Sequence, residues 1–301
     1  MPQIKANGLN FEYEIFGDRK DPTILLIMGF SGQMTMWPVE LCAGLASRGY
    51  QVIRFDNRDV GLSAKLESAG TVNVMEAFMK IASGQPVQAP YQLNDMANDA
   101  VGILDSLGIA KAHIVGASMG GMIAQLVAVN HPGKTRSMTS IMSTTGRRDL
   151  PQAAPEVTAM LTTPPTSTDR AARIDQFVKA QRMIGSKPPL AADEEELRAT
   201  AAIQVDRVPY YPAGIARQLV AILASPPRNE MLKNVKVPAL VIHGAEDPLV
   251  NVEGGKDTAA SIPGARLRIV PNMGHDFTSK LVPIYLREIS DFVAEADAKQ
   301  K

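Results

Sequence analysis

The stretch from Ala112 to Gln125, AHIVGASMGGMIAQ, constrains the fold of this chain more than any other. A short β-branched run is interrupted at Gly116, and the helix-favouring segment MIAQLVAV follows Gly121, an order that predicts a strand, a sharp turn and a helix. Gly116, Ser118 and Gly120 form the pattern GxSxG, in which a serine on a strained turn exposes its hydroxyl at the end of a strand. A glycine-rich turn would explain these residues equally well. The hypothesis of a nucleophilic serine therefore depends on a base and a carboxylate elsewhere in the chain.

Composition indicates a globular chain with a full-sized core. It has 301 residues, of which 45% are hydrophobic and 21% charged, as expected for one domain or for a domain with an insertion. Lysine plus arginine and aspartate plus glutamate each total 31. Because this balance leaves no basic field to hold phosphates, nucleic acid is not an expected partner.

A single cysteine, Cys42, excludes an intrachain disulfide and a structural zinc site built on thiolates. The N-terminal segment lacks the apolar core of a signal peptide, and no apolar run has the length of a membrane span. We therefore expect a cytoplasmic protein with no membrane partner.

Strand patterns alternate with helix patterns along the chain. The predicted strands are Phe11 to Phe16, which is half-buried, antiparallel and at the sheet edge, then Thr23 to Met28, Gln51 to Phe55, the strand before Ser118, Met138 to Met142, Val237 to His243 and Arg266 to Val270. The predicted helices are Met36 to Arg48, Asp95 to Leu107, the segment after Ser118, and Leu281 to Ala294. This alternation favours an α/β fold with a mostly parallel sheet, helices on both faces, and active groups at the carboxyl ends of the strands.

The pattern changes between about residues 145 and 232, where prolines recur and no buried-strand run is found. Helical spacing is present around Ile174, in Glu194 to Ile203 and in Ile215 to Leu223. We predict a core domain of residues 1–145 and 231–301, with residues 146–230 inserted as a helical cap, or lid, over the sheet edge.

A candidate acid and a candidate base follow the last strands. Asp247 lies in HGAEDPLV after the strand Val237 to His243, and His275 lies in PNMGHDF after the last strand. The order Ser118, Asp247, His275 is the one expected for this serine turn. Glu246 and Asp276 are competing carboxylates, and His243 is the rival histidine.

Over nearly its whole length the chain resembles the α/β-hydrolases, and among them it is most similar to the aclacinomycin methylesterase-like branch. The matching motifs are GASMGG at the serine, GAEDPLV at the acid and NMGHDF at the histidine. The family commonly has His-Gly after the third strand. Here the pair is Met28 and Gly29, as in the branch. The run DNRDVGLS also resembles the branch, with Asp59 where related loops more often have glycine.

These assignments predict a serine esterase. His275 would deprotonate Ser118 for attack on an ester carbonyl, and Asp247 would orient the imidazole. The backbone N–H of Met119 would bind the oxyanion. By the resemblance, the N–H of Phe30 would be the second donor. No metal ion or organic cofactor is needed for this chemistry.

Other functions use the same residues. Acyl transfer, carbon-carbon bond hydrolysis and cofactor-free perhydrolysis all need this triad, whereas a non-catalytic ligand receptor would be favoured by a broken one. We expect a small-molecule ester of small to medium, apolar character as the partner. Its acyl and alcohol parts, and the oligomeric state, are not encoded in a readable pattern.

Overall fold

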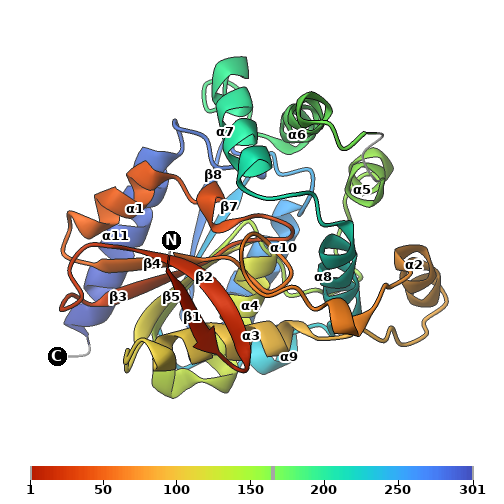
Figure 1. Cartoon of the computed structure of the whole chain (residues 1–301). Helices are drawn as coiled ribbons and strands as arrows, with labels where there is room; N and C mark the ends of the chain where they lie inside the picture. The colour runs from red at the N-terminus through yellow and green to blue at the C-terminus, as the bar shows by residue number, and fades with distance from the viewer. Residues whose placement is uncertain (1, 164–166, 300–301) are drawn as a thin grey trace.

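A twisted sheet forms the centre of the protein, as the computed structural model of residues 2–163 and 167–299 shows (Figure 1). Its strands are β1 (Gln3–Ala6), β2 (Leu9–Phe16), β3 (Thr23–Ile27), β4 (Gln51–Phe55), β5 (Ala112–Ala117), β6 (Thr135–Ile141), β7 (Ala239–Gly244) and β8 (Arg266–Val270). In the described residues they follow the order β1-β2-β4-β3-β5-β6-β7-β8. The β1–β2 and β2–β4 pairs are antiparallel, and the others are parallel. The predicted mostly parallel α/β architecture is thus confirmed.

The register brings the carboxyl ends of the central strands to one edge. Ile27 at the end of β3 pairs with Phe55 of β4 and with Gly116 of β5. On the other side of β5, Ala117 pairs with Ile141 of β6. Loops that follow these strands therefore begin next to one another, as expected for an open α/β sheet.

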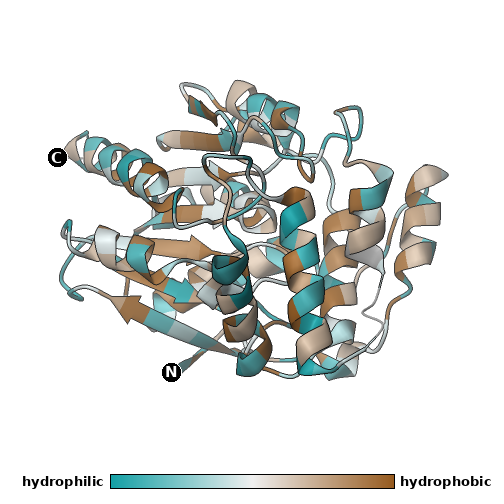
Figure 2. Ribbon diagram, turned by 90° about the horizontal axis from the view of Figure 1, so that it is seen from above, coloured by the Kyte–Doolittle hydropathy of each residue, from teal (hydrophilic) through white to brown (hydrophobic). Residues whose placement is uncertain are grey.

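Alternation along the buried strands divides the core into two layers. Leu25 and Ile27 of β3 face one layer, and Ile24 and Leu26 face the other, because successive strand side chains point to opposite faces. Helices α1 and α11 cover one face, and α3, α4 and α9 pack on the other. Figure 2 shows hydrophobic residues alternating with hydrophilic ones along the helices, as expected where one side of a helix packs on the core.

The helices of the main body are α1 (Val39–Ala46), α2 (Val74–Ala82), α3 (Leu93–Ser106), α4 (Met119–Asn130), α9 (Asn229–Leu232), α10 (Val252–Ser261) and α11 (Val282–Ala298), with short 3-10 turns η1 (Met34–Met36), η2 (Glu67–Ala69) and η3 (Pro132–Lys134). The predicted helices match α1, α3, α4 and α11 to within a few residues. Helices α2, α9 and α10 and strand β1 were not predicted. Because β1 pairs with β2 and forms the edge of the sheet, the prediction that residues 11–16 form an edge strand is wrong.

The chain between β6 and β7 forms helices α5 (Pro155–Thr162), α6 (Arg170–Ile184), α7 (Glu194–Arg207) and α8 (Pro212–Ala224). They lie on the side of the molecule to which the loops after β3 and β4 lead (Figure 1). Residues 164–166 of the predicted insertion lie outside the described residues. The cluster of buried residues between α6 and α7 is small, namely Ile174, Val178 and Ala201. These helices therefore depend on contacts with the main body, while the boundaries 146 and 230 stay a prediction.

Two buried ion pairs connect helices α7 and α8 to the loop after β4. Arg207 at the end of α7 donates to Asp56 at 2.7 Å. Arg217 of α8 makes two bonds of 2.8 Å with the carboxylate of Asp59. Asp59 has a φ of +67°, a conformation that favours glycine. The aspartate noted at this position is therefore explained by its bond to α8, which compensates for the backbone conformation.

Replacing Arg217 with Met is expected to lower the free energy of unfolding by about 3–5 kcal/mol, because Asp59 would remain buried without its cation. Arg170→Met is the matched control. It breaks an exposed pair with Asp206 and is expected to cost less than about 1 kcal/mol. Urea unfolding followed by circular dichroism measures both values, and equal losses in the two variants would contradict a stabilising role for the buried pair.

His113 of β5 is fully buried. Its Nδ1 lies 2.8 Å from the hydroxyl of Ser137, and its Nε2 lies 3.3 Å from Asp297. Burial lowers the pKa of His113 from 6.5 to about 4, although Asp297 opposes the shift. Between these pH values the unfolded chain binds a proton at this residue that the folded chain does not. The stabilisation is complete above pH 6.5 and is lost as the pH falls towards 4.

The free energy of unfolding should fall between pH 7.5 and pH 4.5, and in His113→Asn this fall should be smaller by up to about 3 kcal/mol. The measurement is a series of urea unfolding curves across that pH range. His131→Gln serves as the control, because His131 lies at the end of α4, where its Nε2 contacts Asn98. An unchanged pH dependence in the His113 variant would show that this residue does not titrate in the window.

Candidate active site

Ser118 lies between β5 and α4 in a left-handed backbone conformation, with φ +55° and ψ −120°. Close packing around this turn requires glycine at two neighbouring positions. A Cβ on Gly116 would lie 2.0 Å from the carbonyl oxygen of Gly120, and a Cβ on Gly120 would lie 2.0 Å from the carbonyl oxygen of Ile27. The predicted strand, sharp turn and helix at GxSxG are therefore present, with the serine at the strained position.

Asp247 follows β7 and is buried. Its Oδ1 accepts the backbone N–H groups of Leu249 and Val250 at 2.9 and 2.8 Å, and its Oδ2 lies 2.7 Å from Nδ1 of His275. Burial alone would raise the pKa of this carboxyl, but attraction to His275 and bonds with His275 and His243 outweigh burial and lower the pKa. The carboxylate is thus held ionised and aimed at one imidazole.

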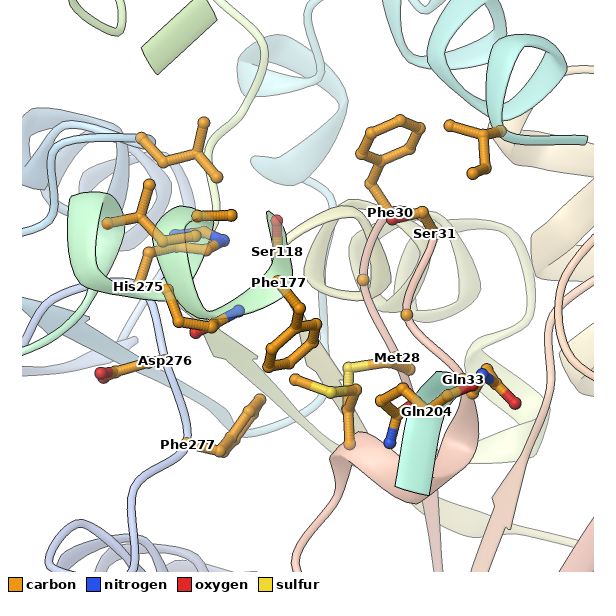
Figure 3. Close-up of a pocket in the computed structure, with 18 of the residues that line it drawn as sticks. Met28, Phe30, Ser31, Gln33, Ser118, Phe177, Gln204, His275, Asp276 and Phe277 are labelled. Atoms are coloured by element: carbon orange, nitrogen blue, oxygen red, sulfur yellow. Dashed lines mark hydrogen bonds between the residues drawn. The ribbon is translucent and has the colours of Figure 1, made fainter. Parts of the chain in front are cut away.

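His275 extends from the loop after β8 towards Ser118 (Figure 3), and both residues line the same cavity. The backbone N–H of His275 donates to the carbonyl oxygen of Ile184 at the end of α6, at 2.8 Å. Because ionised Asp247 can only accept a hydrogen bond, Nδ1 of His275 carries the proton in this pair. Nε2 is then left with a lone pair that can accept a proton.

The competing residues have other contacts. His243 is buried in β7, where its Nε2 donates to the carbonyl oxygen of Val250 at 2.8 Å and lies 3.5 Å from Asp247. Glu246 is exposed. Asp276 accepts two bonds from Ser186, and burial raises the pKa of its carboxyl although these bonds oppose the shift. His243 therefore lies beside Asp247, and Asp276 connects the loop that carries His275 to Ser186, which follows α6.

The turn after β3 packs directly on the serine. A Cβ on Gly29 would lie 3.0 Å from Cβ of Ser118. The N–H of Gly32 bonds to the carbonyl oxygen of Gly29 at 3.3 Å and closes the turn. In the hydrogen bonds recorded for the described residues, none uses the backbone N–H of Phe30 or of Met119. The two N–H groups predicted as oxyanion donors are therefore unused within this part of the chain.

A cavity of about 370 Å³ contains Ser118 and His275 in its wall, a volume in the range of small-molecule sites. Its apolar lining comes from both the main body and the inserted helices: Met28, Phe30, Met36, Met142, Met160, Phe177, Ile184, Val205, Ile215, Leu249 and Phe277. Tyr210 also lines the cavity, and Trp37 is buried against Phe277 of the wall. Methionine side chains are flexible, so this apolar part of the wall can adjust to the shape of a ligand.

The polar residues that connect the insertion to this site were not predicted from the sequence. Arg207, Arg217 and Gln218 reach the loops after β3 and β4. Arg173 lines the cavity but donates to the carbonyl oxygens of Val205 and Val208 at the end of α7. The one signal in the sequence was the aspartate at position 59, where glycine is more usual.

Within residues 2–163 and 167–299, no group of three or more His, Cys, Asp or Glu side chains could hold a metal ion. No helix in those ranges has both the length and the apolar character needed to cross a membrane.

Known proteins resemble this chain in sequence and in fold. Residues 22–278 match the family model described as alpha/beta hydrolase fold. The rhodomycin D methylesterase DauP of Streptomyces sp. (strain C5) is 27% identical over 285 residues, covering 87% of each chain. The 2-hydroxymuconate semialdehyde hydrolase of Pseudomonas putida is 28% identical over 225 residues, covering 72% of this chain and 74% of the relative. Methylesterases among the relatives confirm the resemblance to the methylesterase branch.

Solved structures agree on the fold. The enol-lactonase from Burkholderia xenovorans LB400 superposes with a TM-score of 0.73 at 22% identity, covering 97% of this chain and all of that one. The family match extends over most of the residues that form the sheet, the serine turn and the acid and histidine loops. This chain therefore belongs to the alpha/beta hydrolase fold family, and the relatives named here are hydrolases.

Proposed function

We propose that this protein is a serine hydrolase that cleaves carboxylic esters of small to medium, apolar molecules. One observation carries the proposal: Ser118, in its strained turn, and His275 line the same cavity wall. The Nδ1 of that histidine lies 2.7 Å from a buried carboxylate. Serine alone is a weak nucleophile, and this arrangement is the one that activates it.

In the proposed reaction, Nε2 of His275 accepts the proton of Ser118 as the serine oxygen attacks the ester carbonyl carbon. Asp247 stabilises the resulting imidazolium. The carbonyl oxygen becomes an oxyanion that the N–H groups of Phe30 and Met119 bind. The carbon-oxygen bond to the alcohol then breaks, and His275 returns the proton to the leaving alkoxide. Water, deprotonated by His275, attacks the acyl-enzyme and releases the acid and free Ser118.

The substrate class is inferred from the cavity and from the relatives. The large apolar share of the lining favours acyl and alcohol groups with apolar surface, because that surface leaves water when the substrate binds. The curated relatives that cover most of this chain include rhodomycin D methylesterases. An ester with a small alcohol, held by its apolar acyl portion, is therefore the substrate type we propose.

Covalent labelling tests the nucleophile. An alkyl fluorophosphonate should modify Ser118 in stoichiometric amount, because the activated oxygen displaces fluoride and the phosphonyl oxygen takes the oxyanion position. Intact mass and peptide mapping measure the adduct. Modification at another residue, or none at all, would refute the proposed role of Ser118.

An ester panel then separates the related activities. p-Nitrophenyl and methyl esters varied in the acyl part should be hydrolysed, with release of the acid in water. A faster reaction with an added alcohol acceptor would indicate acyl transfer instead. The similarity to a 2-hydroxymuconate semialdehyde hydrolase makes 2-hydroxymuconate semialdehyde the third arm, and its preferential cleavage would indicate carbon-carbon bond hydrolysis.

A further inference from the structure

One residue of the inserted helices reaches the turn that carries a proposed oxyanion donor. Gln218 of α8 is fully buried. Its Oε1 accepts the backbone N–H of Ser31 at 2.9 Å, and its Nε2 donates to the carbonyl oxygen of Arg58 at 2.8 Å. Both ends of the amide are therefore used, one on the loop after β3 and the other on the loop after β4.

The turn that Gln218 holds is conformationally unusual. Gly29 and Gly32 are joined by the bond that closes it, and Ser31 has a φ of +55°. In a type II turn only the third residue has a positive φ, and glycine is the usual residue at that position. A serine in that conformation is less favourable than a glycine. An outside bond that orients the N–H of Ser31 therefore helps to select this turn over the alternative with the peptide reversed.

The position of this turn matters for catalysis. Phe30 immediately precedes Ser31, and Gly29 packs against Ser118. An oxyanion donor acts only when its N–H lies within hydrogen-bond distance of the place where negative charge develops. A small rotation of the turn would move the N–H of Phe30 relative to the reacting carbonyl while leaving the cavity walls in place.

The same loop is held at its other end by the insertion. Arg207 donates to Oε1 of Gln33 at 2.7 Å and to Asp56 at 2.7 Å. Asp56 in turn accepts the backbone N–H of Met34 at 2.7 Å. Beside Gln218 on α8, Arg217 is bound to Asp59. Hydrogen bonds thus link the positions of α7 and α8 to the position of the turn.

We propose that Gln218 is a positioning residue that orients the turn Gly29–Gly32 so that the N–H of Phe30 can stabilise the transition state. The proposal rests on the proposed function. It implies that the insertion affects the rate of the chemical step and does more than shape the cavity.

Gln218→Met tests this role, because methionine has a similar length but cannot accept the Ser31 hydrogen bond. For p-nitrophenyl butyrate, kcat per phosphonate-titrated serine should fall by about 10- to 100-fold, less than the full loss of one donor, with KM changed by no more than about twofold. The inhibition constant of an alkyl trifluoromethyl ketone, which forms a tetrahedral adduct with Ser118, should rise by a similar factor. A residue that only maintains the fold would lower the melting temperature without this separation of kcat from KM.

Two further variants complete the design. Gln125→Met removes another buried amide, which contacts Arg228 and Thr144 away from the turn, and kcat should stay within about threefold of the unaltered protein. Gln218→Glu keeps an oxygen that accepts the Ser31 N–H but loses the donor to the carbonyl oxygen of Arg58, so it should retain more of kcat than Gln218→Met does. If Gln218→Met does not fold, Gln218→Leu decides: a kcat loss of about tenfold or more at unchanged KM supports the proposal, and a kcat within about threefold of the unaltered protein overturns it.

The outcomes distinguish this inference from the proposed function. If the unaltered protein hydrolyses no ester and is not labelled at Ser118, the proposed function fails and this inference fails with it. If the unaltered protein is active and Gln218→Met has the same kcat and ketone affinity, only the role of Gln218 is overturned.

Discussion

Ser118→Ala is expected to reduce the turnover of short p-nitrophenyl esters by on the order of 10⁴-fold or more. The methyl side chain cannot form an acyl-enzyme, and what remains is the contribution of the cavity and of the oxyanion donors. The left-handed φ of +55° at this position disfavours any residue other than glycine. Alanine keeps a Cβ as serine does, so the backbone should not change.

The measurement is kcat with p-nitrophenyl acetate and butyrate, on protein shown by phosphonate labelling to contain no unaltered enzyme. Ser140→Ala is the matched control. Its hydroxyl, in β6, is buried and has no hydrogen-bond partner among the described residues, so its removal should leave kcat nearly unchanged. Activity retained in Ser118→Ala would refute the assignment of the nucleophile.

Asp247→Asn should lower kcat by on the order of 10⁴-fold. The asparagine amide can present an N–H to Nδ1 of His275, which would move the imidazole proton to Nε2 and remove the lone pair that accepts the proton of Ser118. The fold should survive, because an asparagine oxygen can still accept the N–H groups of Leu249 and Val250 that now bind Oδ1.

Matched variants at the competing residues identify the acid and the base. Glu246→Gln removes a carboxylate one position away that is exposed, and it should leave kcat unchanged. His275→Ala should lower kcat about as much as Ser118→Ala does. His243→Gln should lower kcat less, because His243 contacts Asp247 but does not line the cavity. A greater loss from His243→Gln than from His275→Ala, or from Asp276→Asn than from Asp247→Asn, would reassign the role.

Local patterns were sufficient for much of the fold. Strands β4 and β8 were predicted with the bounds that the structure has, because continuous apolar or alternating runs between polar turns leave little choice of register. Strand β1 was not predicted, since four residues with one buried side chain carry no periodic signal. Its pairing with β2 then moved the predicted edge strand to the interior of the sheet.

Helix α2 was also not predicted, although its local signals are clear. Its segment, VMEAFMKIA, is amphipathic and follows Asn73, whose side chain accepts the N–H of Glu76. These signals are readable in the sequence. The helix has a single buried hydrophobic residue, Ala77, and it packs beside α8.

By itself the sequence determined the alternating architecture, the strained serine turn and the chain order of serine, acid and histidine. These depend on residue spacing and on glycines that only a close strand-helix crossing requires. Only the tertiary structure showed that both His243 and His275 lie close to Asp247 and that His275 is the one in the cavity wall with Ser118, because the spacing of residues along the chain does not specify the direction of a side chain. Only the tertiary structure also revealed that Arg207, Arg217 and Gln218 hold the loops beside Ser118. Such contacts join residues more than 150 positions apart, and nothing in the local spacing of a helix specifies which distant loop its buried polar groups will meet.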